Sequence, residues 1–212
     1  MPEQRTLEKV TAFITDEARS HLLVFRHPSA GVQVPAGTVE AGETAEHAVL
    51  RETYEESGLQ SVRIVARLQP DLVQDFTGAT APTTVLLQVT TLLTEPTEEA
   101  PPTGRLTRGT WVRVTHSHED WTHVIYEEID MNSVPPQTFP RFQGWIPTTQ
   151  LASRLVRSFY HVVVNGLVPR SWEHQAEGKY RFSYYWLPLR PRPQLVEGQD
   201  IWLRMVYNQL IA

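Results

Sequence analysis

The segment from Gly37 to Leu59 constrains the fold of this chain more than any other part of the sequence. It reads GTVEAGETAEHAVLRETYEESGL, in the pattern G-x5-E-x7-R-E-U-x-E-E-x-G-U, where U is a bulky apolar residue. Only Thr53 departs from this pattern, because it stands at an apolar position. Such spacing predicts a tight turn, then a helix, then a helix stop.

The second half of this segment predicts a helix over residues 44–57. Glu43 and Thr44 supply capping oxygens and negative charge where the helix begins. Gly58 suits the left-handed conformation that often ends a helix. The helix therefore has a defined start and a defined end.

Three glutamates, Glu52, Glu55 and Glu56, fall on one face of this helix, because they are spaced i, i+3 and i+4. Carboxylates this close repel one another and raise one another's pKa. A hard divalent cation such as Mg²⁺ or Mn²⁺ removes the conflict, because it prefers negatively charged oxygen ligands. A solvated acidic surface also explains the glutamates, but it does not explain the fixed glycines and arginine.

These residues resemble the Nudix box, the signature of MutT-like hydrolases that cleave nucleoside diphosphates linked to another group. The resemblance implies a Mg²⁺ or Mn²⁺ site made by the carbonyl of Ala36 and the carboxylates of Glu52, Glu55 and Glu56. The family more often has Gly-Gly where this chain has Ala36-Gly37. A carbonyl ligand needs no particular side chain, so this change is mild.

The resemblance also implies the catalytic roles. Arg51 is expected to orient the acidic cluster through an ion pair with Glu43. Glu52 or Glu56 is expected to take the proton of the attacking water. Some family members place this base in a distant loop. Glu173 and Glu177 are the candidates for a base in such a loop, although both are more simply explained as polar residues of a loop between two strands.

Arg26 follows an apolar strand and is a candidate contact for a phosphate or a base, although a lone arginine at a strand end is more often solvated. Arg26 and Glu173 are the two substrate-binding candidates outside the box. The aromatic residues Tyr160, Trp172 and Tyr184 are candidates to stack on a base.

Composition agrees with a cytoplasmic enzyme. The chain has no cysteine, which excludes disulfides and thiol catalysis. No apolar run is long enough for a membrane span, and the N-terminus does not resemble a signal peptide. A formal charge of −5 at pH 7 argues against general nucleic-acid binding. It does not argue against a small nucleotide or pyrophosphate substrate, because a metal ion supplies local positive charge.

The resemblance implies an α+β fold, a Nudix α/β/α sandwich with a mixed sheet. Apolar runs predict its strands over residues 10–14, 22–25, 62–68, 158–164 and 180–187. A closing amphipathic helix is predicted over residues 199–210, with Ile201, Trp202, Met205 and Leu210 buried. The gap between 68 and 158 is too long for a compact domain of this family, so an insertion is expected.

The insertion is expected to be a small all-β unit. Residues 111–126 predict a hairpin with its turn at 117–120. The apolar run with Trp111, Val112 and Val114 comes before the turn, and the run with Trp121, Val124 and Tyr126 comes after it. The sequence over 83–152 is similar to bacterial Src-homology-3-like barrels. We therefore expect a discontinuous Nudix domain over 1–70 and 153–212, and an inserted barrel-like domain over 71–152. One elongated domain with an extended β-rich loop is the alternative.

His116, His118 and His123 lie in this hairpin. A His-x-His pair near a third histidine is able to bind zinc. Polar residues are also common in turns without any ligand, and that is the simpler interpretation here.

The sequence does not identify the substrate. By resemblance, the box determines the reaction, whereas residues outside it select the substrate. The first hypothesis is a hydrolase of organic pyrophosphates. The second is a nucleotide-sensing module whose inserted barrel contacts a protein partner. The intact acidic cluster favours the enzyme. A homodimer is also compatible with the sequence.

Overall fold

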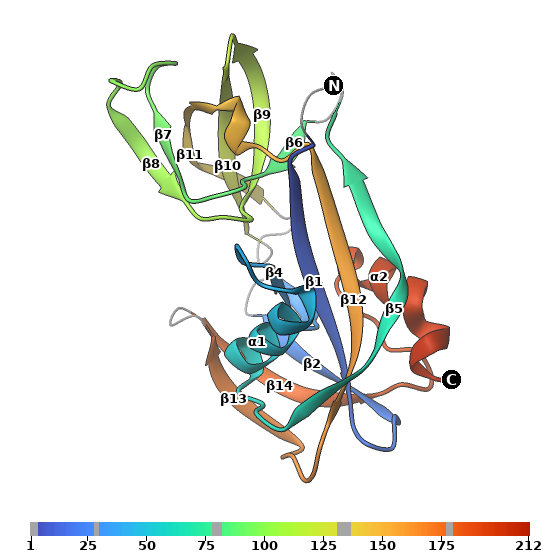
Figure 1. Ribbon diagram of the computed structural model, residues 1–212. Helices are drawn as coiled ribbons and strands as arrows, with labels where there is room; N and C mark the ends of the chain where they lie inside the picture. The colour runs from blue at the N-terminus through green and yellow to red at the C-terminus, as the bar shows by residue number, and fades with distance from the viewer. Residues whose placement is uncertain (1–3, 28–29, 78–81, 131–136, 177–179) are drawn as a thin grey trace. The chain divides into compact units, whose positions relative to one another are not determined.

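The computed structural model describes residues 4–27, 30–77, 82–130, 137–176 and 180–212. The chain divides into two units (Figure 1). We call Glu8–Leu72 with Arg157–Ala212 the α/β unit, and Met1–Leu7 with Val73–Val156 the β unit. The β unit thus includes residues 1–7 and 153–156, which lie outside the predicted insertion at 71–152. Its assignment as an inserted domain stays a prediction.

A single sheet organises the α/β unit, with the strand order β13-β14-β2-β1-β12-β5, β3 paired to β2 and β4 paired to β1. Its elements are β1 (Thr6–Thr15), β2 (His21–His27), β3 (Gly31–Gln33), β4 (Ala36–Thr38), α1 (Ala45–Ser57), β5 (Val62–Asp75), β12 (Arg154–Val164), β13 (Ser171–Ala176), β14 (Tyr180–Pro188) and α2 (Glu197–Leu210). Both helices of the described residues are too short or too polar to cross a membrane.

The sheet is mixed. Arg157 on β12 donates to the carbonyl of Val10 on β1, and four residues later His161 contacts Thr15. Both strands therefore advance in the same direction. The pairings of β2 with β1, β3 and β14 are antiparallel, as is that of β13 with β14.

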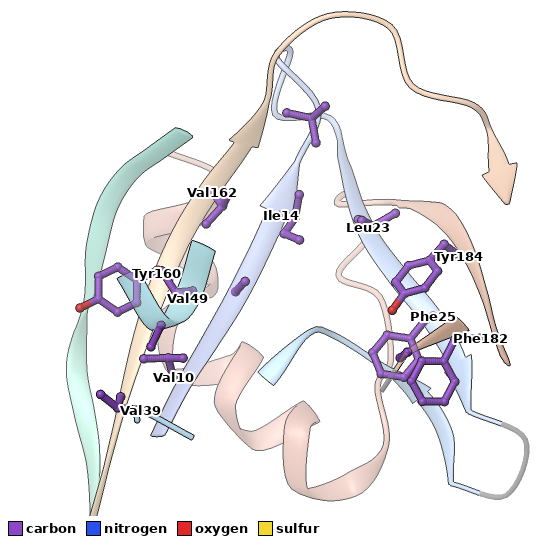
Figure 2. Close-up of a cluster of buried hydrophobic side chains, with 14 residues drawn as sticks. Val10, Ile14, Leu23, Phe25, Val39, Val49, Tyr160, Val162, Phe182 and Tyr184 are labelled. Carbon is purple, nitrogen blue, oxygen red and sulfur yellow. The ribbon is translucent and has the colours of Figure 1, made fainter. Parts of the chain in front are cut away.

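The two helices cover opposite faces of this sheet. Alternate residues of β1 point to opposite sides, so Val10 and Ile14 pack with Val49 of α1, while Phe13 packs with residues of α2. Figure 2 shows the cluster on the α1 face. The arrangement is the expected α/β/α layering. The buried residues of α2 that join the second cluster are Leu203, Val206 and Leu210.

The prediction for the buried face of α2 was partly wrong. Leu210 is fully buried as expected, but Ile201 is 53% exposed. Trp202 and Met205 are only partly buried, at the edge of the cluster. The residues of α2 that face the sheet are therefore shifted by about one position toward the C-terminus from those predicted.

The β unit contains a six-stranded sheet with the order β6-β9-β10-β11-β7-β8. Its elements are β6 (Thr83–Val85), β7 (Thr90–Leu93), β8 (Pro102–Leu106), β9 (Trp111–His118), β10 (Trp121–Asp130), β11 (Gln137–Pro147) and the short 3-10 helix η1 (Thr148–Gln150). Its core is built by Leu86, Leu92, Leu106, Val112, Val124, Ile146 and Leu151.

One expectation for the β unit needs correction. In the described part of the chain no pairing joins the outer strands β6 and β8, so the sheet is not a closed barrel. The hairpin of β9 and β10 forms as predicted, with Glu119 at its turn in the left-handed region (φ 50°). Trp111, Val112 and Val114 lie on β9, before the turn, and Trp121, Val124 and Tyr126 lie on β10, after it, as predicted.

Candidate active site

The ends of α1 are fixed by the residues that the sequence pattern requires there. Thr44 is the N-cap, and its hydroxyl accepts from the amide of His47 at 3.2 Å. Gly58 adopts φ 76°, and its amide donates to the carbonyl of Tyr54 at 2.8 Å. These caps satisfy backbone groups that a helix leaves without partners. They also fix where α1 begins and ends.

Thr53, the one departure from the box, is accommodated within the helix. Its side chain is fully buried. Its hydroxyl donates to the carbonyl of Val49, one turn earlier, at 2.7 Å. A threonine has nearly the shape of a valine, and this bond removes the cost of burying its hydroxyl. The departure therefore leaves the packing of α1 on the sheet intact.

Strands β13 and β14 brace the last turn of α1. Three side chains donate to carbonyl oxygens of that turn, which have few partners within the helix. They are Tyr184 to Glu56 at 2.6 Å, Trp172 to Ser57 at 2.8 Å and His174 to Glu55 at 3.1 Å. These bonds hold the backbone of the glutamates against the sheet. Sequence reasoning did not find this brace.

The aromatic residues that the sequence suggested for base stacking serve the core instead. Tyr184 and Tyr160 are buried. Burial raises the pKa of both phenols, that of Tyr160 to about 12. The Tyr160 hydroxyl donates to Glu46 of α1 at 3.1 Å. Trp172 is half-buried and stacks on Tyr184, with ring centroids 5.3 Å apart.

The loop at β4 meets α1 at two glutamates. A Cβ atom on Gly37 would fall 1.9 Å from the carboxylate of Glu52, so only glycine allows this approach. The carboxylate of Glu56 accepts from the amide of Ala36 at 3.1 Å. The segment before this turn is held from α2, where the Gln199 side chain accepts from the amide of Val34 at 2.7 Å. The turn and the acidic face are thus brought together, as the resemblance implied.

Arg51 is the centre of the acidic cluster. It donates to both oxygens of Glu43, at 2.9 and 3.0 Å, which is the expected ion pair. It also donates to Glu52 at 2.9 Å, to Glu55 at 2.8 Å and to the carbonyl of Thr38 at 3.0 Å. Its hydrogen bonds hold the pKa of Glu43 below the usual value. The bond to Glu43, helped by the other carboxylates, raises the pKa of Arg51.

The donor set fits the divalent cation that the family implies. In the described ranges, no three acidic or histidine side chains converge closely enough to hold an ion as they stand. Glu52 and Glu55 are instead neutralised by Arg51. Yet carboxylates and a nearby backbone turn are the hard oxygen donors that Mg²⁺ or Mn²⁺ prefers. Glu55 is 44% exposed, so this side of the cluster is open to solvent.

The two candidates outside the box lie on the other face of the sheet. Arg26 and Glu173 are both paired with Ser183 of β14, so the three residues form one row. Phe25 and His174, their strand neighbours, point to the α1 side. Glu173 forms an ion pair with Arg181 at 3.3 Å. The structure therefore does not bring these residues to the glutamates of α1, and their roles stay predictions.

Glu177, the other distant candidate for the base, lies outside the described residues. The remaining candidates for this role, Glu52 and Glu56, are the two that contact the β4 turn.

Comparison with known proteins agrees with this site. The family model described as NUDIX domain matches residues 6–130, more than half of the chain. The matched range includes β1, the β4 turn and all of α1. A comparison with curated proteins gave no match.

Proposed function

The chain belongs to the Nudix family, whose members are hydrolases of pyrophosphate bonds, and we propose that it is a metal-dependent pyrophosphohydrolase. Its substrate is a nucleoside diphosphate linked to another group, or a related organic pyrophosphate. The observation that carries the proposal is the contact between helix and turn, with Glu52 against Gly37 and Glu56 on the amide of Ala36.

Glu52, Glu55, Glu56 and the carbonyl of Ala36 are the groups that would hold Mg²⁺ or Mn²⁺. When bound, such an ion neutralises phosphate oxygens and lowers the pKa of a coordinated water. Arg51 is paired with three carboxylates, and that of Glu55 is the most exposed of the three. A cation from solvent would therefore reach Glu55 first.

Arg51 is a positioning residue in this proposal. Its bidentate bond to Glu43 anchors the guanidinium at the start of α1. This anchor would keep the arginine beside Glu52 and Glu55 if their carboxylates held a cation. Its positive charge then limits the repulsion within the cluster.

The chemical step is attack of water at phosphorus, which forms one phosphorus–oxygen bond and breaks that of the anhydride. Glu52 or Glu56 accepts the proton of the attacking water at a carboxylate oxygen. The Glu56 carboxylate accepts from the amide of Ala36, and the Glu52 carboxylate lies against Gly37 and accepts from Arg51, so neither needs to travel far. This restraint supports catalysis because it removes conformational freedom before the reaction.

The alternative is a nucleotide-binding module in which the β unit, proposed as an inserted Src-homology-3-like domain, contacts a protein. Such a module needs the ligand-binding surface but not the proton acceptor. The two functions therefore differ in the effect of replacing one carboxylate by an amide.

The test is a panel of organic pyrophosphates with Mg²⁺ or Mn²⁺, scored by phosphate release after phosphatase treatment. We expect turnover by the natural protein and a fall on the order of 10³ in kcat for Glu56→Gln. Glu98→Gln, an exposed change of the same charge in the β unit, is the matched control and should keep full activity. If both variants turn over equally, or if the natural protein is inert on every compound but binds one of them, the hydrolase proposal fails.

A further inference from the structure

Every carbonyl oxygen in the last turn of α1 accepts a hydrogen bond. An α-helix leaves its last four carbonyls without partners inside the helix. In α1 the carbonyl of Tyr54 accepts from the amide of Gly58, the residue that ends the helix, at 2.8 Å. The next three carbonyls, those of Glu55, Glu56 and Ser57, accept from side chains of β13 and β14. Water would satisfy exposed carbonyls equally well, so helix formation alone does not require three side-chain donors.

The three donors are Trp172, His174 and Tyr184, which we call the brace. Trp172 lies directly opposite Tyr184 in the ladder of β13 and β14, and His174 is two residues further along β13. Alternate residues of a strand share a face, so all three point to the α1 side. Trp172 stacks on Tyr184, and Tyr184 packs against Phe25 of β2, with ring centroids 5.3 Å apart in both pairs. Figure 2 shows Tyr184 beside Phe25, so the brace is anchored in the core.

Gly58 makes room for one member of the brace. A Cβ atom at this position would lie 2.9 Å from Nδ1 of His174. The imidazole therefore rests against backbone that carries no side chain, and its Nε2 reaches the carbonyl of Glu55 at 3.1 Å. Because Gly58 also adopts φ 76°, the same glycine ends the helix and admits the contact with β13.

Glu55 and Glu56 stand at the end of α1 that is less favourable for a carboxylate. The aligned carbonyls give the C-terminal end of a helix a negative partial charge, which favours cations. The last turn of α1 has no basic residue. The brace supplies N–H and O–H donors at this end instead, and their positive hydrogens oppose the partial charge. It thereby lowers the repulsion between the helix end and the two carboxylates.

Glu56 links the brace to the β4 turn. Its carbonyl accepts from Tyr184 at 2.6 Å, and its carboxylate accepts from the amide of Ala36 at 3.1 Å. Because the backbone and the side chain of one residue are both held, a shift of the last turn would pull the carboxylate away from Ala36. The position of this carboxylate therefore depends on strands that are far from α1 in the sequence.

We propose that Trp172, His174 and Tyr184 are positioning residues of the hydrolase site, because they keep Glu55 and Glu56 in place to receive the divalent cation. This inference rests on the proposed function. It adds β13 and β14 to the site, although both lie outside the range 6–130 that the family model matches. Groups that orient metal ligands commonly contribute about 10- to 100-fold to metal affinity, so the brace should have an effect of this size.

Amide hydrogen exchange in the metal-free protein tests this role without catalysis. The brace variant combines Trp172→Phe, which keeps an aromatic ring, with His174→Ala. The amide of Gly58 reports the last turn, and the amide of Ala36 reports the carboxylate that it binds. We expect both amides to exchange about tenfold faster than in the natural protein, because two hydrogen bonds to the turn are lost.

Trp186→Phe is the matched control. Trp186 lies on β14, and its Nε1 donates to the carbonyl of Pro169, a loop residue outside α1, at 3.1 Å. Exchange at the two reporter amides should therefore be unchanged in this control. His174→Ala alone repeats the test at a single half-buried position of the outermost strand β13, should the double variant fail to fold.

Binding of Mn²⁺, measured as the loss of the free-ion paramagnetic resonance signal, gives the second readout. We expect the dissociation constant of the brace variant to be about tenfold or more above that of the natural protein, and that of Trp186→Phe to be unchanged. Unchanged exchange at Ala36, or unchanged Mn²⁺ affinity, in the brace variant overturns the positioning role. If the natural protein itself binds no Mn²⁺ and cleaves no pyrophosphate, the hydrolase proposal fails, and this inference fails with it.

Discussion

Glu52 lies so close to Gly37 that a single added methyl group would occupy the position of its carboxylate. The distance from a Cβ atom on Gly37 to the Glu52 carboxylate would be 1.9 Å. The relationship explains why the sequence pattern needs a glycine before the helix as well as the glutamates on it.

Gly37→Ala should therefore impair catalysis more than folding. The clash is with the far end of a flexible side chain, so Glu52 can move aside while the backbone remains. A shift of about 1 Å in such a group is expected to lower kcat by about a hundredfold. Steady-state kinetics and thermal unfolding measure the two effects separately.

Gly198→Ala is the control for this substitution. A Cβ atom at Gly198 meets nothing within 4 Å, so both activity and stability should stay close to those of the natural protein. If Gly37→Ala were as active as Gly198→Ala, the proposed position of Glu52 in the site would be wrong.

Tyr184→Phe should loosen the last turn of α1. It removes the hydroxyl that donates to the carbonyl of Glu56 at 2.6 Å in a buried environment. Removing this hydrogen-bond donor from the buried carbonyl is expected to lower the free energy of unfolding by about 1–2 kcal/mol. Urea unfolding measures this cost. Tyr185→Phe, on the opposite face of the same strand, is the control and should cost less.

Thr53→Val should be tolerated. Valine fills the same volume, and the lost hydroxyl bonds only within its own helix. We expect the free energy of unfolding to change by less than about 1 kcal/mol, with unchanged kcat. A much larger loss in urea unfolding would show that the Thr53 hydroxyl has a role outside α1.

Acid should destabilise the α/β unit through His161. This residue is 1% exposed, and its Nε2 atom contacts the hydroxyl of Thr15 at 2.9 Å. Burial, aided by nearby positive charges, lowers its pKa to about 4. Because the unfolded chain has the higher pKa, it binds the proton first as the pH falls. Stability is therefore complete above about pH 6.5 and is lost progressively down to pH 4.

The size of this effect is limited by the pKa difference, which corresponds to about 3 kcal/mol at most. His161→Gln keeps a hydrogen-bonding side chain but does not titrate, so its free energy of unfolding should vary less between pH 6.5 and 4. His47→Gln, at an exposed position, should behave like the natural protein. An equal slope in all three proteins would rule out His161 as the acid-sensitive group.

The helix α1 was predictable because its signals are local. Thr44 and Gly58 mark its ends, and the i, i+3, i+4 spacing fixes the glutamate face. The ion pair of Arg51 with Glu43 was expected from the resemblance to the Nudix box, because Glu43 precedes α1 and the helix signals alone do not pair it with Arg51.

The brace on α1 was not predictable, because it depends on strand order. Trp172 and Tyr184 reach the helix only because β13 and β14 lie beside β2, far from α1 in the sequence. Alternation along a strand also leaves open which half of its residues faces the helix. This is why Arg26 and Glu173 were grouped with the site although they lie on the other face.

The periodicity of α2 contained a similar ambiguity. The apolar side chains of Ile201 and Trp202 suggested one inward face, whereas Leu203 and Val206 occupy it. An apolar stripe broader than one face is compatible with more than one rotation of the helix. The sheet beneath α2 decides between them, and the sequence of the helix alone does not.

Binding of Mn²⁺, followed by electron paramagnetic resonance as the loss of the free-ion signal, tests the acidic cluster most directly. The comparison is between the natural protein, the variant with Glu52→Gln and Glu56→Gln, and the Glu98→Gln control. The account predicts bound Mn²⁺ in the natural protein and the control, and little or none in the double variant. Equal Mn²⁺ binding by all three proteins, or binding by none of them in the presence of a pyrophosphate compound, would contradict it.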